Sequence, residues 1–192
     1  DRSPRRCAMR YLILGCGPAG IAAAKSIRKA KSDAEIVIAA DESEAPYLRP
    51  LLPDLILGDI DEEGVLDPQG KGLEEKGIAV LRGKRAARLD TANRKVEFDD
   101  RSKEPYDRLL IATGGKPEIP KILRRKSEAI LSFDSLDDAR KIREWAKAPG
   151  AAVAAVYGPG YLAIEACRAL RKTKKGVVWI RPDLPRHGYP IA

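Results

Sequence analysis

The stretch Tyr11-Leu12-Ile13-Leu14-Gly15-Cys16-Gly17-Pro18-Ala19-Gly20 decides the fold that we predict for this chain. Its first four residues form a short, nearly all-apolar run, as expected for a parallel strand that is covered on both faces. A GxGxxG turn follows directly, and the alanine-rich residues 21–31 have apolar side chains recurring on one side, which predicts a helix. A second apolar run at 36–39 completes a strand–turn–helix–strand unit.

The residues of this turn are those that a dinucleotide site requires. Gly15 allows a tight turn, Gly17 lets the backbone approach a pyrophosphate, and Gly20 lets the helix pack close to the strand. The start of the helix offers unpaired amides and a positive dipole end to phosphate oxygens. Asp41 and Glu42 follow about 20 residues later, where a carboxylate can accept hydrogen bonds from ribose hydroxyls. The alternative is a glycine turn with a structural role only.

The same pattern returns about 140 residues later. An apolar run at 151–157 leads into the GxGxxA turn Gly158-Pro159-Gly160-Tyr161-Leu162-Ala163, and a helix at 161–171 and a strand at 177–180 are predicted to follow. About 20 positions after the turn stands Arg181 instead of an acid. An arginine there can pair with a ribose 2′-phosphate, which favours NADP(H) over NAD(H). As an alternative, Arg181 is an exposed loop residue, because the next residue, Pro182, predicts a turn.

The region between the two copies is mixed in character. The sequence predicts, in order, a loop-rich region at 45–77 that is punctuated by prolines, a strand at 78–81, a hairpin of 86–89 with 95–98, a strand at 108–112, a linker at 116–134 and a helix at 135–147. The helix begins with a capping-box-like pattern in which Asp138 stands in for the usual Glu or Gln. We therefore predict an α/β fold with two Rossmann-like βαβ units and a small β-meander.

Composition narrows the class of protein further. The 192 residues are 44% hydrophobic and 33% charged, which is ordinary globular composition, and the apolar runs are too short to span a bilayer. Three cysteines without a CxxC pair indicate neither a disulfide scaffold nor a zinc site, so we expect no metal and a cytoplasmic location.

The net charge of +8 suits anionic ligands or an acidic protein partner, although a solvated basic surface is the alternative. The basic clusters at 124–126 and 171–175 lack interleaved aromatic residues, so we expect no nucleic-acid binding.

The order of these motifs resembles the FAD-dependent pyridine nucleotide-disulfide oxidoreductase superfamily. Within it, the chain is most similar to rubredoxin or ferredoxin reductases and to the flavin part of NAD(P)H nitrite reductases. The resemblance runs from about residue 9 to about residue 185 and is carried by the four stretches YLILGCGPAGIAAAKSIR, ADESEAPYLRPLLP, YDRLLIATGGKP and AVYGPGYLAIEACRAL. It implies the first part of an FAD-binding domain at 9–117 and an incomplete NAD(P)-binding domain at 118–192.

The resemblance also implies roles for individual residues. The FAD pyrophosphate would lie against Gly15, Gly17, Pro18, Ala19 and Gly20. The adenosine ribose would be bound by Glu42 or Asp41, and the adenine by the backbone of Ala86. The residues that would close over the FAD are Ala112, Thr113 and Gly114. The nicotinamide dinucleotide would contact Gly158, Gly160, Tyr161, Leu162 and Glu165, with Arg181 at its ribose.

Two of these residues are candidate catalytic residues. Arg49 would lie near the isoalloxazine ring, where a cation stabilises negative charge on reduced flavin. Glu165 would meet the nicotinamide. The alternatives are that Arg49 is a surface residue in a proline-rich loop and that Glu165 is a solvent-facing charge favoured by the helix dipole.

The chain departs from the family pattern in two ways, in its cysteines and in its length. Thiol-dependent members carry redox cysteines just beyond the flavin segment, whereas residues 46–58 contain none. We therefore expect an FAD-dependent NAD(P)H oxidoreductase that passes electrons directly to an external acceptor such as a small redox protein. The family continues well beyond the length of this chain, so we expect a fragment, a homo-oligomer or a chain that another chain completes. The competing hypotheses are a non-catalytic nucleotide-binding subunit and an unstable fragment.

Overall fold

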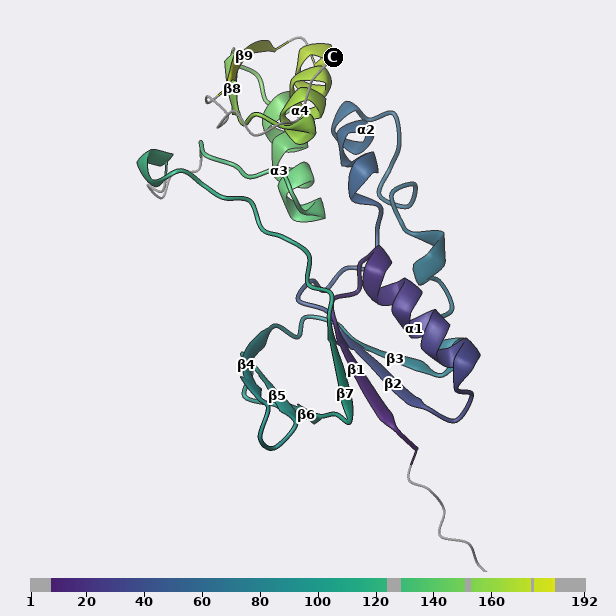
Figure 1. Cartoon of the computed structure of the whole chain (residues 1–192). Helices are drawn as coiled ribbons and strands as arrows, with labels where there is room; N and C mark the ends of the chain where they lie inside the picture. Colours follow the sequence, from purple (N-terminus) through teal and green to yellow (C-terminus); the bar gives the residue numbers. More distant parts are fainter. Residues whose placement is uncertain (1–7, 124–128, 151–152, 174, 182–192) are drawn as a thin grey trace, which may run out of the picture. The chain divides into compact units, whose positions relative to one another are not determined.

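The chain forms two compact units (Figure 1). The computed structural model describes residues 8–123, 129–150, 153–173 and 175–181. The first unit comprises Asp1–Tyr47 and Leu66–Gly115, and the second comprises Leu48–Val65 and Lys116–Ala192. The change of unit after Gly115 lies close to the boundary expected at 117/118. The assignment of residues 48–65 to the second unit was not predicted.

The first unit is built on a parallel sheet of four strands. The strand order is β3 (Ile78–Leu81), β2 (Glu35–Ala39), β1 (Arg10–Leu14) and β7 (Arg108–Ile111). Helix α1 (Pro18–Ala30) connects β1 to β2. The smaller antiparallel meander consists of β4 (Ala86–Asp90), β5 (Lys95–Phe98) and β6 (Lys103–Pro105). The predicted first βαβ unit, hairpin and strand before Gly114 are thus confirmed.

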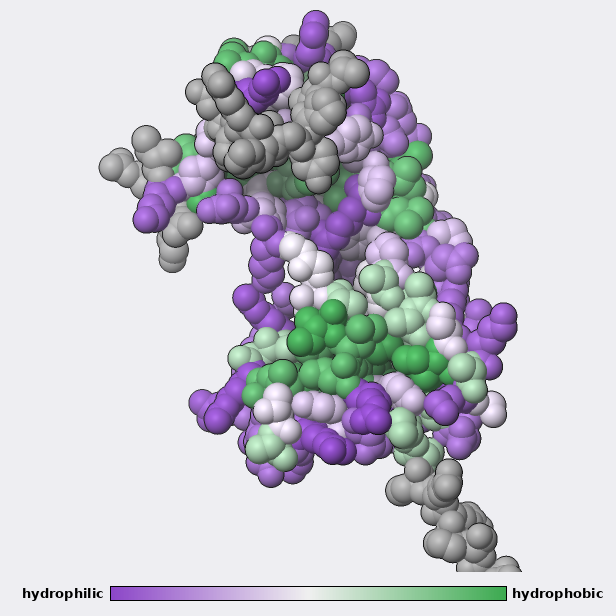
Figure 2. Space-filling model, in the orientation of Figure 1, coloured by the Kyte–Doolittle hydropathy of each residue, from purple (hydrophilic) through white to green (hydrophobic). Residues whose placement is uncertain are grey.

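The two central strands of this sheet, β1 and β2, are buried on both faces, as their continuous apolar runs predict. On one face, α1 packs against Ile13, Ile36 and Ile38, which are at most 1% exposed. On the other face, Val96 and Phe98 of the meander pack on Leu12 and its neighbours. Figure 2 shows a band of apolar surface over this sheet. Two residues of β7, the last strand of the sheet among the described residues, remain open: Leu110 is 39% and Ile111 is 61% exposed.

Among its described residues, the second unit combines a two-stranded parallel sheet with three α-helices and two short 3₁₀ helices. Strands β8 (Val153–Tyr157) and β9 (Gly176–Ile180) flank α4 (Tyr161–Lys172), which confirms the second predicted βαβ unit. Helix α3 (Leu136–Lys147) begins with the predicted capping box, in which Ser135 accepts from the amide of Asp138. Part of the predicted linker forms the short 3₁₀ helix η4 (Lys121–Leu123), whereas the basic run at 124–126 and Lys174 lie outside the described residues.

Residues 45–77 are loop-rich, as predicted, but they also contain short helices that were not predicted. They contain the 3₁₀ helices η1 (Arg49–Leu51), η2 (Pro68–Gly70) and η3 (Glu74–Lys76), and the α-helix α2 (Leu52–Leu57). The prolines led the sequence interpretation astray, because Pro53 stands in the first turn of α2, where a missing amide hydrogen costs nothing. Gly58 ends α2 in the left-handed conformation. Within the described residues, no helix is long and apolar enough to cross a bilayer.

Candidate functional site

The first glycine turn lies at the carboxyl end of β1 and is shaped by two close backbone contacts. Gly15 has φ +110°, and a Cβ on it would lie 2.2 Å from the carbonyl oxygen of Ala112. A Cβ on Gly20 would lie 2.0 Å from the carbonyl oxygen of Gly15 and 3.4 Å from Ile13. The geometric reasons predicted for Gly15 and Gly20, a tight turn and close packing of helix on strand, are therefore observed.

Gly17 differs from its two neighbours because it faces open space. A Cβ on Gly17 would meet no described atom within 4 Å. Gly17 is also the N-cap of α1, it makes no side-chain cap hydrogen bond, and Pro18 occupies the first turn. The start of α1, including Ala19, thus keeps its amides and its positive dipole end uncapped by a side chain. This combination fits an anionic group such as a pyrophosphate.

The two acids predicted to bind ribose follow β2 directly. Asp41 is exposed and Glu42 is partly buried. The carbonyl of Glu42 accepts a hydrogen bond from the Gly83 amide at 3.1 Å, and its carboxylate accepts one from the Tyr47 hydroxyl at 2.5 Å. Ligands of open α/β sheets bind beyond the carboxyl ends of the strands, and both acids lie at that edge. Tyr47 is a residue that the sequence analysis missed, because no motif signals a contact made through a loop.

Four further residues predicted to contact FAD lie at the start of β4 and in the segment that follows β7. The amide of Ala112 donates to the carbonyl of Leu14 at 2.8 Å, so Ala112 crosses directly over the first turn. Thr113 and Gly114 follow it and are exposed. Ala86 is the exposed first residue of β4 and pairs with Phe98. Ala112 is thus shown beside Gly15, while contact of these residues with FAD stays a prediction.

Cys16 lies within the first glycine turn, and its pKa depends on the burial and the charges around that turn. Burial raises the pKa of Cys16 to about 11, and the Arg82 guanidinium acts in the opposite direction. Arg82 also forms an ion pair with Glu74, in which Nη2 of Arg82 lies 3.8 Å from Oε1 of Glu74. Arg82 thus supplies positive charge near a turn that is expected to bind phosphate, and the sequence analysis did not single it out. Among the described residues no cluster of three or more His, Cys, Asp or Glu side chains could hold a metal ion.

The second glycine turn is open in the same way as the first. The amide of Gly158 donates to the carbonyl of Ile180, and the Trp179 indole donates to the carbonyl of Gly158 at 2.8 Å. Gly160 caps α4 without a side-chain hydrogen bond, and a Cβ on it would meet no described atom within 4 Å. The next residues are strongly exposed, Tyr161 by 69% and Leu162 by 52%. Arg181 follows β9 and is exposed.

Glu165 takes part in an ion-pair chain on α4. Its carboxylate accepts from Nε of Arg168 at 2.8 Å, and Nη2 of Arg168 donates to Asp54 of α2 at 3.0 Å. Hydrogen bonds to Asp54 and Glu165 raise the pKa of the Arg168 guanidinium. The Glu165 side chain is only 14% exposed, so it is not a freely solvated charge. Its contact with a nicotinamide stays a prediction.

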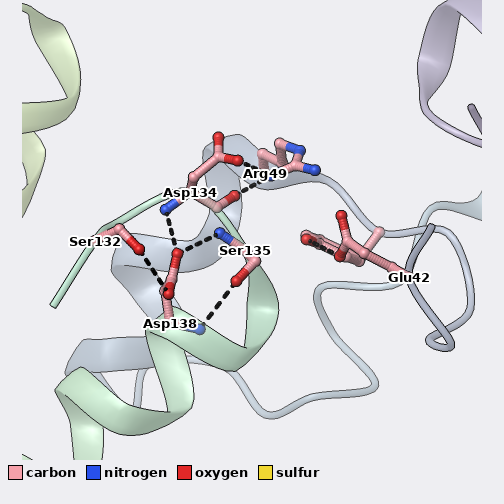
Figure 3. A network of polar contacts seen from close by, with 7 residues as sticks. Glu42, Arg49, Ser132, Asp134, Ser135 and Asp138 are labelled. Atoms are coloured by element: carbon pink, nitrogen blue, oxygen red, sulfur yellow. Dashed lines mark hydrogen bonds and ion pairs between the residues drawn. The ribbon is translucent and has the colours of Figure 1, made fainter. Parts of the chain in front are cut away.

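Arg49 belongs to the second unit and contacts the start of α3. Its guanidinium donates to the carbonyl of Asp134 and forms an ion pair with the Asp134 carboxylate at 3.0 Å (Figure 3). The same segment is organised by Asp138, which accepts from Ser132 and from the amides of Asp134 and Ser135. The Arg49 side chain is 46% exposed. The structure thus gives Arg49 a clear structural contact, and its predicted role beside a flavin stays a prediction.

Comparisons with known proteins agree with this geometry. The NADH-rubredoxin oxidoreductase of Clostridium acetobutylicum is 34% identical over 161 residues, which cover 84% of this chain and 41% of that protein. An NADH oxidase of Methanocaldococcus jannaschii is 29% identical over 169 residues, which cover 85% of this chain and 38% of that protein. The crystal structure of the Clostridium acetobutylicum enzyme superposes with a TM-score of 0.78 and 30% identity, over 91% of this chain and 45% of that chain.

The chain therefore spans about two fifths of the length of the curated relatives it matches. A family model described as pyridine nucleotide-disulphide oxidoreductase matches residues 9–184, which is nearly the whole chain. This match includes both glycine turns and every element of the two units. The chain belongs to the pyridine nucleotide-disulphide oxidoreductase family.

Proposed function

We propose that this chain forms the opening parts of the FAD site and of the NAD(P)H site of a flavin-dependent oxidoreductase. The observation that carries the proposal is the first glycine turn, where Gly17 faces open space at an uncapped helix start and Glu42 follows the neighbouring strand. When bound, FAD supplies the redox chemistry, accepting hydride from NAD(P)H and passing electrons on singly or in pairs. The protein supplies binding, orientation and charge.

The two glycine turns and Glu42 each have a definite part in this proposal. The amides at Gly17, Ala19 and Gly20 hold the pyrophosphate of FAD, and Glu42 accepts from its adenosine ribose. The amides at the start of α4, beyond Gly160, hold the pyrophosphate of the nicotinamide dinucleotide. Residues 46–58 contain no cysteine, so we propose that electrons leave the flavin directly for an outside acceptor.

The direct test uses two matched glycine substitutions. Both Gly17 and Gly160 face open space, so a valine at either position leaves the packing of its own unit intact. We expect Gly17→Val to abolish FAD retention while NAD(P)H affinity persists, and Gly160→Val to do the reverse. The measurements are flavin absorbance after gel filtration and nicotinamide binding by fluorescence. Retention of FAD by Gly17→Val at the wild-type level would overturn the proposal.

The identity of the nicotinamide cofactor rests on Arg181. We propose that its guanidinium pairs with the 2′-phosphate of NADP(H), since it stands where an NAD-binding chain has an acid. The names of two relatives specify NADH, so the question is open to a simple measurement. Arg181→Ala should weaken NADPH binding about tenfold and leave NADH binding unchanged. Equal affinities of the wild-type chain for NADPH and NADH would contradict the proposed preference for NADP(H).

A small acidic electron carrier is the partner that we propose, with rubredoxin as the example because one relative is named for it. The net charge of +8 would steer such a carrier toward the protein. The rate of rubredoxin reduction by the flavin-loaded protein should then fall as salt rises, while reduction of a neutral quinone does not. A rate for rubredoxin that is independent of ionic strength would contradict steering.

A second candidate function is a nucleotide-binding subunit that another chain completes. One observation favours it: apolar side chains of β8 and β9, among them Val153 and Val178, are exposed. In that case the purified chain would bind ADP but would not retain flavin until a second chain is added. Bleaching of bound flavin in the purified chain by NADH or NADPH would exclude this alternative.

A further inference from the structure

The carboxylate of Glu42, which is predicted to bind ribose, has a hydrogen-bond partner within the first unit. Tyr47 donates its hydroxyl to Oε2 of Glu42 at 2.5 Å. Tyr47 is only 8% exposed, although it lies in a loop after β2. A buried phenol needs a hydrogen-bond partner, and here the partner is the side chain assigned to the ligand.

The position of Tyr47 is itself set by a second loop. Tyr47 pairs with Leu66 in an isolated antiparallel bridge, and the Asp67 amide donates to the carbonyl of Pro46 at 2.8 Å. Asp67 is 4% exposed and caps η2 through its carboxylate. Gly70 lies so close to Pro46 that a Cβ on it would be 2.7 Å from the proline ring. Tyr47 is therefore held through its backbone as well as through its hydroxyl.

The backbone of the acid is fixed from the other side. The Gly83 amide donates to the carbonyl of Glu42 at 3.1 Å, and the Lys84 amide donates to the carbonyl of Ala40 at 2.7 Å. With its backbone tied to the segment after β3 and one carboxylate oxygen tied to the Tyr47 hydroxyl, Glu42 has few rotamers left. A ligand that uses this carboxylate does not have to order it on binding.

We propose that Tyr47 is a positioning residue that presets the Glu42 carboxylate for the hydroxyls of an adenosine ribose. This inference rests on the proposed function of Glu42 and adds a residue to which the sequence analysis assigned no role. Tyr47 thereby contributes to affinity for the adenosine half of the dinucleotide without touching it. The contribution depends on ribose hydroxyls, which makes it separable from a general effect on folding.

The experiment compares two nucleotides on the full chain by calorimetry, ADP and 2′,3′-dideoxy-ADP. We expect Tyr47→Phe to weaken ADP binding about fivefold to tenfold and to leave dideoxy-ADP binding unchanged, because only the ribose hydroxyls use the carboxylate. Glu42→Gln should weaken ADP binding as well, and adding Tyr47→Phe to it should cause no further loss. Tyr106→Phe is the matched control, since Tyr106 is a half-buried tyrosine that packs against the Leu12 cluster of the same unit.

The outcomes separate this inference from the proposed function. An equal loss of affinity for both nucleotides in Tyr47→Phe, or additive losses in the double variant, would show a structural role and overturn the inference alone. Equal affinity of the wild-type chain for ADP and dideoxy-ADP, or no binding of ADP, would overturn the ribose role of Glu42 and this inference with it. Hydrogen exchange of β1 and β2 in each variant establishes that the first unit stays folded.

Discussion

The chain contains the strand–glycine turn–helix–strand pattern twice, and the two copies differ in how far their strands are buried. In the first copy, Leu12, Ile13 and Ile38 are fully buried. In the second, Val153 is 60% and Val178 is 52% exposed. The local geometry is nevertheless alike, because both turns lead into a helix that begins at a glycine without a side-chain cap.

The cause of the difference is the number of layers and not the motif. The first sheet has four strands, with α1 on one face and the meander on the other. The second sheet has two described strands, and β8 alternates between exposed and half-buried residues. A glycine turn therefore forms from local sequence, whereas burial of its strands depends on what covers both faces of the sheet. Four predictions test this comparison.

The largest effect is expected where the two motifs differ in their last residue, Gly20 against Ala163. A Cβ on Gly20 would lie 2.0 Å from a backbone oxygen, so Gly20→Ala should destabilise the first unit by about 3 kcal/mol or more. The reciprocal change Ala163→Gly should cost the second unit only about 1 kcal/mol. Hydrogen exchange of β1 and β2 measures the first unit. Fluorescence of Trp145 and Trp179 measures the second, which contains both tryptophans of the chain. Unchanged protection of β1 in Gly20→Ala would refute the close contact.

The next largest effect is the difference in stability lost when a buried and an exposed strand residue are each changed to alanine. Ile38→Ala in β2 should destabilise the first unit by about 3 kcal/mol, because it leaves a cavity between α1 and the sheet. Val178→Ala in β9 should change stability by less than about 0.5 kcal/mol, since this side chain is already in contact with water. Urea unfolding followed by the same two probes measures both. A large loss in Val178→Ala would mean that another surface covers β9 in solution.

A smaller effect is expected from the helix starts, because α3 has a capping box and α1 has none. Ser135→Ala removes the oxygen that accepts from the Asp138 amide, so we expect a loss of about 1 kcal/mol in the second unit. Trp145 lies within α3 and reports this loss by fluorescence. Ser26→Ala is the control, since Ser26 is an exposed residue within α1, and it should change stability by less than about 0.5 kcal/mol. Equal effects of the two changes would argue against the cap.

The smallest expected effect concerns the reactivity of the Cys16 and Cys167 thiols and not the stability of either unit. Burial raises the pKa of Cys16 from 9.0 to about 11, so at pH 8 its thiolate fraction should be about 100-fold below that of an unshifted thiol. Its alkylation rate by iodoacetamide should therefore keep rising tenfold per pH unit up to about pH 10. Burial also raises the pKa of Cys167. Site-resolved mass spectrometry measures both rates. A plateau for Cys16 near pH 9 would contradict its burial.

Much of the candidate site could be predicted because its signals are local. The glycines of both turns and the acids after β2 were identified from short motifs, whereas Ala112 was singled out by the family resemblance, and the structure places its carbonyl close to Gly15. Helix α2 was missed because prolines were taken to indicate loops, although Pro53 is compatible with a first helical turn. The contact between Tyr47 and Glu42 was missed because the loop at 66–70 holds Tyr47 in place, and no pattern around either residue records that.

The amino-acid sequence by itself determined where each strand, turn and helix of the two βαβ units forms, because apolar periodicity and glycine at sterically crowded positions act over a few residues. Only the tertiary structure decided which strands are enclosed, that residues 48–65 join the second unit, and which loop holds the Glu42 carboxylate. These features depend on contacts between segments far apart in the chain, and the side chains that make them carry no local mark of their partners.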